Sequence, residues 1–563
     1  MPALTVLTPG QRNLLALFGI WAVLMWIVFA TRPLLPVDET RYASVAWEMW
    51  FRGEQLVPHL NGVPYSHKPP LLFWFMELGW LFFGVSEAWA RLVAPLFALG
   101  GVFLSQPVFR LIWPEQPERA LLAPWILMGG FLWTLITTVT MFDMLNAVFT
   151  LGAITGVVLV WRRRSFAGWT LFGACVGLGI LSKGPVILIY TLPTALLAPW
   201  WLSKSEQNWW RWYGGGLGAV TFGIAIALAW AVPAGSAGGE EYRAAILWGQ
   251  TTGRLAESFA HARAFWWYLP VLPLALFPWV FWPRVWHGLR SVWGTRDSGL
   301  RLCIAWAVPG VLLLSLISAK QPHYLVPLLP AFSFAVAATL PVPGNASGRD
   351  LLWPGFIMFM LGVILVAIAF WIDVDPATAL TVLDLPDWGS NISILLGISI
   401  GAAGAVAALR RWKTTPVHVA VLAAQSLVVV AAFHVFAMRP VAFAYDLKPA
   451  AMFVREAIRE GRRIAFADEY HGQLHFLGRI EQRFPVMRPG AAASWGQANV
   501  RGRIVMVTDT IPPQWTGYEY LQPYRGRVLT VWSGDTLSAY LINLRRDRAL
   551  QVGAGDGRAL SAR

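Results

Sequence analysis

The chain has 563 residues, of which 56% are hydrophobic and only 13% are charged. Soluble globular domains carry about 25% charged residues, so this composition excludes an ordinary soluble protein. The mean hydropathy is +0.53, and apolar runs of about 20 residues recur along the sequence, as membrane-spanning helices require. We therefore predict a polytopic α-helical membrane protein.

The net charge of +14 comes mainly from short loops between the apolar runs. Clusters of Lys and Arg in such loops set membrane topology, so we interpret the charge as orientation and not as nucleic-acid binding. The 33 Trp suit the belts at the two membrane surfaces. The two cysteines, Cys175 and Cys303, lie in or beside apolar runs, so we expect no disulfide.

The first apolar run, 14–30, is followed by PVDETRYA and not by a small-residue cleavage site, so we expect an uncleaved span. Thirteen runs can cross a membrane, namely 13–31, 88–113, 120–139, 143–161, 166–182, 184–202, 213–232, 267–283, 301–318, 323–340, 351–371, 391–409 and 417–438. A further run, 71–84, is short and follows Pro69 and Pro70. We interpret it as a helix that lies along the membrane surface.

If the helix at 71–84 lies along the membrane surface and does not cross it, almost every basic cluster falls on one face of the membrane. These clusters are Arg162 to Arg164, Lys204 with Arg211, Arg284 with Arg290 and Arg296, and Arg410 and Arg411 with Lys413. The acidic segment 372–388 falls on the other face. Because basic loops stay in the cytoplasm, we predict thirteen spans with a cytoplasmic amino terminus.

This topology exports loops 32–87 and 233–266 and everything after about residue 440. The exported tail is polar and Arg-rich, with a helical stretch AAMFVREAIREG and strand-like runs RIAFAD, RIVMVTD and RVLTVWS. We predict a transmembrane domain over 1–439 and a small α/β domain over 440–563 on the outer side.

Ionisable residues gather at the outer ends of the spans, where they are costly unless they have a partner or a task. The set comprises Asp38, Glu39, Arg41, Tyr65, His67, Lys68, Asp143, Lys183, Glu240, Glu241, Arg243, Arg254, His261, Lys320, His323 and Tyr324. Lys183 could simply snorkel to the interface, and Arg254 could be solvated. His261 and His323 fit satisfied polar residues better than metal ligands, since no metal-ligand spacing is present. Asp38, an acid at a membrane surface beside Arg41, is the strongest site candidate.

Four cations drawn from three loops, Arg41, Lys68, Arg254 and Lys320, could bind a phosphate at the depth of lipid head groups. An apolar groove between spans could hold the lipid tail. A nearby carboxylate could act as a base or stabilise a cationic, sugar-like transition state, while the cations stabilise the leaving phosphate. These parts predict transfer of a group from a lipid phosphate.

The stretches PVDETRYA, SHKPPL and AKQPHYLVPLLP resemble the GT-C class of polyprenyl-phosphate glycosyltransferases. Within that class they are most similar to the 4-amino-4-deoxy-L-arabinose lipid A transferases, relatives of the protein O-mannosyltransferases. The resemblance covers the whole organisation, including the exported α/β domain. It implies an enzyme of the bacterial inner membrane that moves aminoarabinose from undecaprenyl phosphate to a lipid A phosphate on the periplasmic side, giving resistance to polymyxin.

By motif, the resemblance implies that Asp38 is the catalytic acid of the first loop and Asp143 a second functional acid, and we group Glu39 with them. Around the lipid phosphate we expect Arg41, Lys68 and Tyr324, with Tyr65 nearby, Lys320 as a further cation, and Arg254 by its place in the large loop. His67 stands where many relatives have an acid. We expect no required cofactor, because these cations could replace a divalent metal, whose presence stays open.

The acceptor decides the role of Asp38. A phosphate monoester has a second pKa of about 6, so a phosphate acceptor is already ionised and gains little from a base. Asp38 would then position the sugar and stabilise positive charge on its ring carbon. A Ser or Thr acceptor would need the same carboxylate as a base. The resemblance suggests inversion by a single displacement.

Three alternatives stay open. The enzyme could move another sugar, such as mannose, to a protein or another glycan. A transporter is disfavoured, because no paired interrupted helices lie at the midplane and the ionisable residues gather at the outer edge. A structural scaffold would leave Asp38, Arg41 and Lys68 without a purpose.

Overall fold

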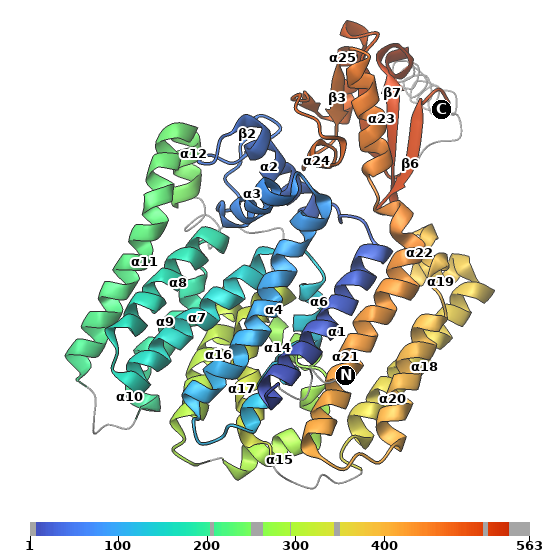
Figure 1. The fold of residues 1–563 in the computed structure, drawn as a ribbon. Coiled ribbons are helices and arrows are strands. Elements are labelled where there is room, and N and C mark those ends of the chain that lie inside the picture. Colours follow the sequence, from blue (N-terminus) through green and yellow to red (C-terminus); the bar gives the residue numbers. More distant parts are fainter. Residues whose placement is uncertain are drawn as a thin grey trace, which may run out of the picture.

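The computed structural model describes residues 7–202, 208–248, 263–292, 294–342, 349–510 and 516–539. Long helices pack side by side into a bundle, and a small α/β domain stands at one end of it (Figure 1). The short helices α2 (Asp38–Arg52) and α3 (Leu71–Phe83) lie at that same end. The predicted fold class, a helical membrane bundle with a carboxy-terminal α/β domain, is confirmed.

Nine helical segments of the described chain are long and apolar enough to cross a membrane. They are α1 (Pro9–Thr31), α4 (Glu87–Ile112), α7 (Phe142–Arg163), α8 (Phe166–Lys183), α11 (Trp209–Gly238), α16 (Ser298–Leu316), η7 with α17 (Pro322–Thr339), α18 (Leu352–Val374) and the run Thr415–Arg459, which opens with α21 (Thr415–Phe433). A pair bent by 60°, Arg119–Met128 with α6 (Phe131–Thr137), makes a tenth if it is one span. The first part of that pair ends with α5 (Ala123–Met128).

Three of the thirteen predicted spans form shorter apolar helices: α9 (Ile187–Leu196), the segment Phe265–Ala275 that contains α14 (Tyr268–Ala275), and α20 (Leu395–Leu409). Pro193 and Pro273 lie inside α9 and α14, where a proline removes a helical hydrogen bond and favours a break. Every predicted run therefore falls on helix, while the count of thirteen crossings stays a prediction.

Local sequence explains where the first helix starts. The Thr8 hydroxyl accepts a hydrogen bond from the Gln11 amide at 3.3 Å, and the Gln11 side chain accepts one from the Thr8 amide at 2.9 Å. This reciprocal capping box, with Pro9 at the first helical position, fixes the amino end of α1.

Close helix packing depends on glycine at two places in particular. A Cβ on Gly156 of α7 would lie 2.5 Å from the Gly168 carbonyl of α8, and one on Gly362 of α18 would lie 2.3 Å from the Gly401 amide of α20. Lipid is as apolar as the helix surfaces, so the hydrophobic effect does not drive helices together in a membrane. They associate instead through close backbone packing of this kind. These glycines therefore set the spacing of both helix pairs.

The run 71–84 forms helix α3, whose 13 residues extend roughly 20 Å and fall short of a bilayer core of about 30 Å. Helix α2 begins with Asp38 and Glu39, whose charges suit the amino end of a helix, and ends at Gly53 with φ of +67°. The hairpin β1 (His59–Leu60) and β2 (Val63–Pro64) connects the two helices. The interfacial position of α3 stays a prediction.

The carboxy-terminal domain contains a five-stranded sheet in the order β4-β3-β5-β7-β6. Its strands are β3 (Ile464–Ala467), β4 (Val486–Met487), β5 (Arg503–Thr508), β6 (Tyr520–Tyr524) and β7 (Arg527–Ser533), and its helices are α23 (Lys448–Arg459), α24 (His475–Gly478) and α25 (Ala492–Ala498). Strand β3 runs parallel to β4 and β5, whereas β7 is antiparallel to β5 and β6. The three predicted strand runs match β3, β5 and β7, and the predicted helix matches α23. The boundary at residue 440 stays a prediction.

Candidate active site

Asp38 lies at the start of α2 with its side chain half exposed. Its carboxylate forms an ion pair with Arg41 and accepts a hydrogen bond from the Tyr42 hydroxyl at 3.2 Å. Burial lowers the pKa of Arg41, but the neighbouring Tyr65, Tyr42 and Asp38 outweigh it and raise that pKa above its usual value. Arg41 is therefore a permanent cation beside a carboxylate that solvent can reach.

Asp143 lies in the first turn of α7 and is almost completely buried. It forms an ion pair with Lys183 from the end of α8, and the His323 ring nitrogen Nε2 lies 3.9 Å from its Oδ2. The Lys183 amino group also sits 4.4 Å from the centre of the Tyr324 ring. Three segments that are distant in sequence thus converge on one carboxylate.

Aromatic rings join the Asp38 and Asp143 regions. The rings of Tyr42 and Phe142 are almost perpendicular, with centroids 4.9 Å apart, and the Lys68 amino group lies 5.8 Å from the Phe142 ring centre. Lys68 is close enough to interact electrostatically with Asp143. The structure therefore places Asp38, Lys68 and Asp143 at a common end of the bundle. We call Asp38, Arg41, Lys68, Asp143, Lys183, His323 and Tyr324 the site cluster.

Tyr65 borders the site cluster on the side of the hairpin. It is buried, with its ring 5.2 Å from that of His67 and 6.2 Å from that of Phe73. Its proximity to Arg41 fits the predicted place near the lipid phosphate. Its role as a phosphate contact stays a prediction.

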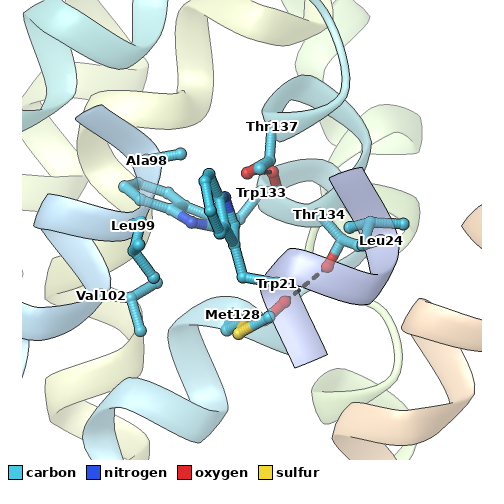
Figure 2. Close-up of a pocket in the computed structure, with 9 residues that line it drawn as sticks. All are labelled: Trp21, Leu24, Ala98, Leu99, Val102, Met128, Trp133, Thr134 and Thr137. Carbon is cyan, nitrogen blue, oxygen red and sulfur yellow. Dashed lines mark hydrogen bonds between the residues drawn. The ribbon is translucent and has the colours of Figure 1, made fainter. Parts of the chain in front are cut away.

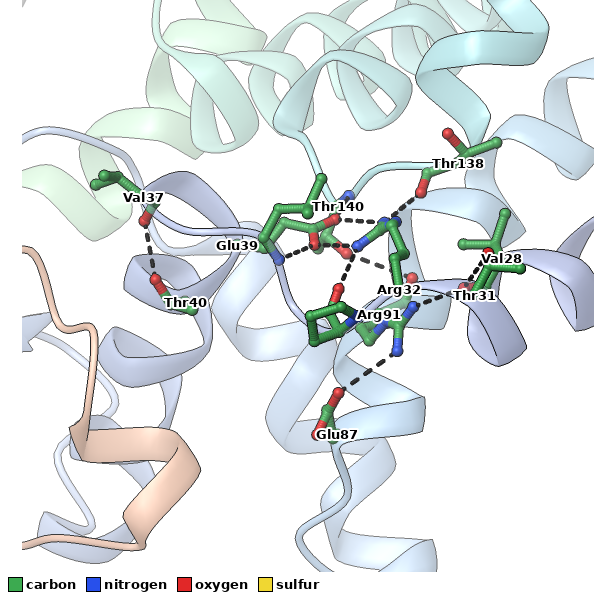
Figure 3. A network of polar contacts seen from close by, with 12 residues as sticks. Val28, Thr31, Arg32, Val37, Glu39, Thr40, Glu87, Arg91, Thr138 and Thr140 are labelled. Carbon is green, nitrogen blue, oxygen red and sulfur yellow. Dashed lines mark hydrogen bonds and ion pairs between the residues drawn. The ribbon is translucent and has the colours of Figure 1, made fainter. Parts of the chain in front are cut away.

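Glu39, grouped with Asp38 by sequence, has a different environment (Figure 3). Its carboxylate accepts hydrogen bonds from Arg32 at 2.5 and 2.9 Å, from the Leu35 amide at 2.8 Å and from the Thr140 amide at 2.7 Å. Burial would raise the pKa of Glu39, but the charge and hydrogen bonds of Arg32 and the two amides lower it. Glu39 is thus a fully occupied carboxylate, and this geometry favours a structural role over the predicted catalytic one.

The Arg32–Glu39 pair belongs to a larger set that we call the buried network, which comprises Arg32, Glu39, Glu87, Arg91, Thr138 and Thr140. Arg32 also donates to the Thr138 carbonyl, and Arg91 donates to the Val28 carbonyl at 3.3 Å. The network therefore ties together the end of α1, the start of α2, helix α4 and the loop before α7.

Two further predicted phosphate ligands are Lys320 and Arg254. Lys320 is 3% exposed, and its amino group donates to the carbonyls of Arg263 at 3.0 Å and Ile317 at 2.5 Å. This favours a role in holding the chain before η7 (Pro322–Leu328). Arg254 lies outside the described residues.

Sequence reasoning missed Tyr42 and weighed Lys183 only as a snorkelling residue. The spacing of four residues between Asp38 and Tyr42 on a helix was a usable signal, because such residues share a face. The position of Lys183 just before Gly184 and Pro185 indicated that it lies near the membrane surface, but it did not indicate the ion pair with Asp143.

The described residues contain no group of three or more His, Cys, Asp and Glu side chains placed to hold a metal ion. A small pocket deeper in the bundle, among Trp21, Leu99, Met128, Trp133 and Thr134, has a volume of only about 10 Å³ (Figure 2). That is room for about one water molecule, so this part of the bundle is packed core and holds no substrate.

A family model described as dolichyl-phosphate-mannose-protein mannosyltransferase matches residues 67–232. An undecaprenyl phosphate-α-4-amino-4-deoxy-L-arabinose arabinosyl transferase of Pseudomonas aeruginosa is 28% identical over 386 residues, which are 67% of either chain. The transferase of the same description from Edwardsiella ictaluri is 30% identical over 366 residues, and the alignment covers 62% of this chain and 64% of that relative.

Solved structures extend the likeness to nearly the whole chain. ArnT from Cupriavidus metallidurans in the apo state superposes with a TM-score of 0.70 at 19% identity, over 93% of this chain and 98% of that one. The same protein bound to undecaprenyl phosphate gives a TM-score of 0.68 over 92% and 97%. The chain is thus similar in sequence to the undecaprenyl phosphate-aminoarabinose transferases and shares the GT-C fold of the solved ArnT structures, as its motifs predicted.

Proposed function

We propose that this chain transfers 4-amino-4-deoxy-L-arabinose from undecaprenyl phosphate to a phosphate of lipid A. The observation that carries the proposal is the site cluster, which combines half-exposed Asp38 with the cations Arg41 and Lys68 at one end of the bundle. The fold, shared with a transferase solved with undecaprenyl phosphate, supports a lipid-linked donor.

The same proposal assigns a location. The protein is a multi-pass membrane protein, and we place it in the bacterial inner membrane with a cytoplasmic amino terminus. The site cluster and the α/β domain then face the periplasm, where the lipid A acceptor lies. The basic clusters at the opposite loops support this orientation, because positive loops stay inside. Adding a sugar with an amine to lipid A would reduce its negative charge and so give resistance to polymyxin.

In the proposed reaction an acceptor phosphate oxygen attacks the sugar ring carbon, and the bond from that carbon to the donor phosphate breaks. Undecaprenyl phosphate leaves with the bonding electrons, and the configuration at the carbon inverts. Arg41 and Lys68 bind the donor phosphate and stabilise the charge that develops on it, an interaction that strengthens where water is scarce. Asp38 stabilises positive charge on the ring carbon, and Asp143 with Lys183 shapes the site.

We expect no metal requirement, because these side-chain cations supply the positive charge that a divalent ion would bring. Activity should persist in excess EDTA. A loss of transfer in EDTA that added Mg²⁺ or Zn²⁺ restores would contradict this expectation.

The family-model match over residues 67–232 favours one alternative, transfer of a different sugar such as mannose to a protein hydroxyl. A hydroxyl acceptor needs a general base, whereas an ionised phosphate does not. Transfer of the sugar to a peptide that contains serine or threonine, with lipid A left unmodified, would favour the hydroxyl acceptor.

The test is an assay with purified protein, synthetic aminoarabinosyl undecaprenyl phosphate and lipid A, paired with mass spectrometry of lipid A from cells with and without the gene. We expect an added aminopentose on lipid A in both settings. An unchanged lipid A mass in both settings would overturn the proposed function.

A further inference from the structure

The carboxy-terminal domain docks directly onto α2, the helix that carries Asp38. The Ser44 hydroxyl donates to the Gly472 carbonyl at 2.6 Å and accepts from the Phe476 amide at 3.1 Å. The Trp47 indole donates to the Ile480 carbonyl at 3.0 Å. All three domain residues belong to the segment 468–485 between β3 and β4, which we call the docking loop.

An aromatic side chain of the docking loop enters the core of the helical bundle. Phe476 is 1% exposed and stacks on Trp80 of α3, with ring centroids 5.5 Å apart and planes 10° from parallel. The Arg479 guanidinium lies over the rings of Phe476 and Trp47, at 4.0 and 5.5 Å from their centres. In Figure 1 α24, which carries Phe476, lies against α2. The domain therefore shares a core with the bundle.

The hairpin between α2 and α3 adds a third contact. The Asn61 side chain donates to the Phe484 carbonyl at 2.9 Å and accepts from the Phe484 amide at 2.8 Å. Asn61 is buried at a backbone φ of +55°, a conformation that Asn tolerates better than most residues. This paired contact fixes the hairpin at a single register against the docking loop.

The docking loop is itself held in one shape. His475 contacts the Tyr470 hydroxyl through Nδ1 and the Gln482 carbonyl through Nε2, the latter at 3.1 Å. Burial lowers the pKa of His475 to about 4, so its ring is neutral at physiological pH. Gln473 accepts from the His471 amide at 2.6 Å. The loop therefore presents a preformed surface to α2.

The position of this loop in the sheet is informative. It leaves the carboxyl end of the parallel strand β3, the edge where open α/β sheets usually bind ligands. Here α2 and the hairpin occupy that edge. The domain thus holds another part of the same chain at the edge where open α/β sheets usually bind ligands.

We propose that the carboxy-terminal domain positions the catalytic helix: the docking loop clamps α2 through Ser44 and Trp47, and α2 transmits this constraint to Asp38. Ser44 follows Asp38 by six residues, about 9 Å along a rigid helix. Asp38 then keeps its place relative to Asp143, which a different helix carries. The catalytic part of this inference rests on the proposed function, whereas the mechanical part does not.

The test compares Phe476→Ala and Ser44→Ala with the control Phe453→Ala. Phe453 packs against Tyr520 inside the same domain, with ring centroids 5.1 Å apart, so its loss perturbs the domain without removing a contact to α2. Amide hydrogen exchange is measured on purified full-length protein, and kcat and KM are measured for the undecaprenyl-linked donor.

We expect faster exchange over residues 39–52 and a kcat lowered about tenfold for Phe476→Ala, with a KM within about threefold of the original, since small misplacements of a catalytic group cost rate more than binding. Ser44→Ala should change the exchange rate and kcat in the same directions but by less, and Phe453→Ala should leave the exchange rate of α2 and kcat unchanged. Unchanged exchange in α2 for both interface variants, or a kcat loss without faster exchange, would overturn the proposal. If α2 loosens but the original protein transfers no aminoarabinose, only the proposed function fails.

Discussion

Asp38 and Glu39 are neighbours in sequence and each pairs with an arginine, yet they belong to two regions that differ in exposure to solvent. In the site cluster Asp38 is half exposed and meets one cation and one hydroxyl. In the buried network Glu39 is 3% exposed, and protein donors occupy both its oxygens. A carboxylate whose hydrogen-bonding capacity is filled by the protein stabilises structure, whereas one with an open side can meet a substrate.

The buried network also supports the site cluster mechanically. Glu39 accepts from the Thr140 amide, and Thr140 precedes Asp143 by three residues. One carboxylate therefore joins the chain at the start of α2 to the chain at the start of α7. From this comparison we expect substitutions in the site cluster to remove activity and those at the Arg32–Glu39 pair of the buried network to remove stability.

The largest effect is expected from Asp38→Asn. The amide keeps the size of the side chain but loses the negative charge that stabilises the ring carbon, so transfer should fall by about a thousandfold. The melting temperature should change little, because Asp38 is half exposed. Both quantities are measured on detergent-purified protein. Retention of more than a tenth of the original rate would contradict the role given to Asp38.

Glu39→Gln should reverse that pattern. The substitution leaves Arg32 buried beside a neutral amide, and breaking a buried pair costs about 3–5 kcal/mol of unfolding free energy. Denaturation of the purified protein measures this loss. The matched control is Glu87→Gln, whose 3.4 Å pair with Arg91 is more exposed and worth at most about 1 kcal/mol. Equal losses in the two variants would mean that burial of the Arg32–Glu39 pair does not set its contribution to stability.

Lys68→Ala sharpens the comparison within the site cluster. Loss of a charge-assisted contact to the donor phosphate costs about 2 kcal/mol, so the KM for the donor should rise about thirtyfold. Lys68→Arg keeps the charge and should recover part of the affinity. Steady-state kinetics at varied donor concentration check both. An unchanged KM in Lys68→Ala would remove Lys68 from the donor site.

The sequence was sufficient to predict which residues meet at one end of the bundle. Counting the apolar runs places Asp38, Lys68, Asp143 and Tyr324 on the same side of the membrane, because each crossing alternates the side on which the next loop lies. It was insufficient to separate Asp38 from Glu39. Consecutive residues on a helix point about 100° apart, and only the packing of α2 decides which one faces the bundle interior.

The same limit applies to the fold. The strand runs RIVMVTD and RVLTVWS were recognisable because they are rich in β-branched residues, and RIAFAD because its apolar stretch is bounded by charged residues. By contrast, β4 has two residues and β6 contains Pro523. Lys320 was predicted as a phosphate ligand from its charge and depth. Its carbonyl partners come from Arg263 and Ile317, and a hydrogen bond to a backbone carbonyl leaves no signal in side-chain sequence.

Glu77 of α3 is buried like Glu39 but, unlike Glu39, has a hydrogen-bond partner in the described chain for only one carboxylate oxygen. Its substitution has the smallest effect that we predict. It is 4% exposed; Oε1 accepts from Gln55 at 3.2 Å, while Oε2 has no hydrogen-bond partner among the described residues. Burial raises the pKa of Glu77 to about 7, against the opposing hydrogen bond from Gln55. The folded protein therefore holds this proton up to about pH 7, while the unfolded chain releases it near pH 4.5.

Because the folded state binds more protons between those values, this group makes stability fall as pH rises from about 4.5 to about 7, with no further change above. Glu77→Gln removes the titration. Its melting temperature should match that of the original protein near pH 5 and exceed it by about 2 °C at pH 8. Arg41 and Lys68 are unaffected by this change, so transfer at pH 7 should persist. If the melting temperatures of Glu77→Gln and of the original protein differ by the same amount across this pH range, Glu77 is ionised in the folded state, like Glu39.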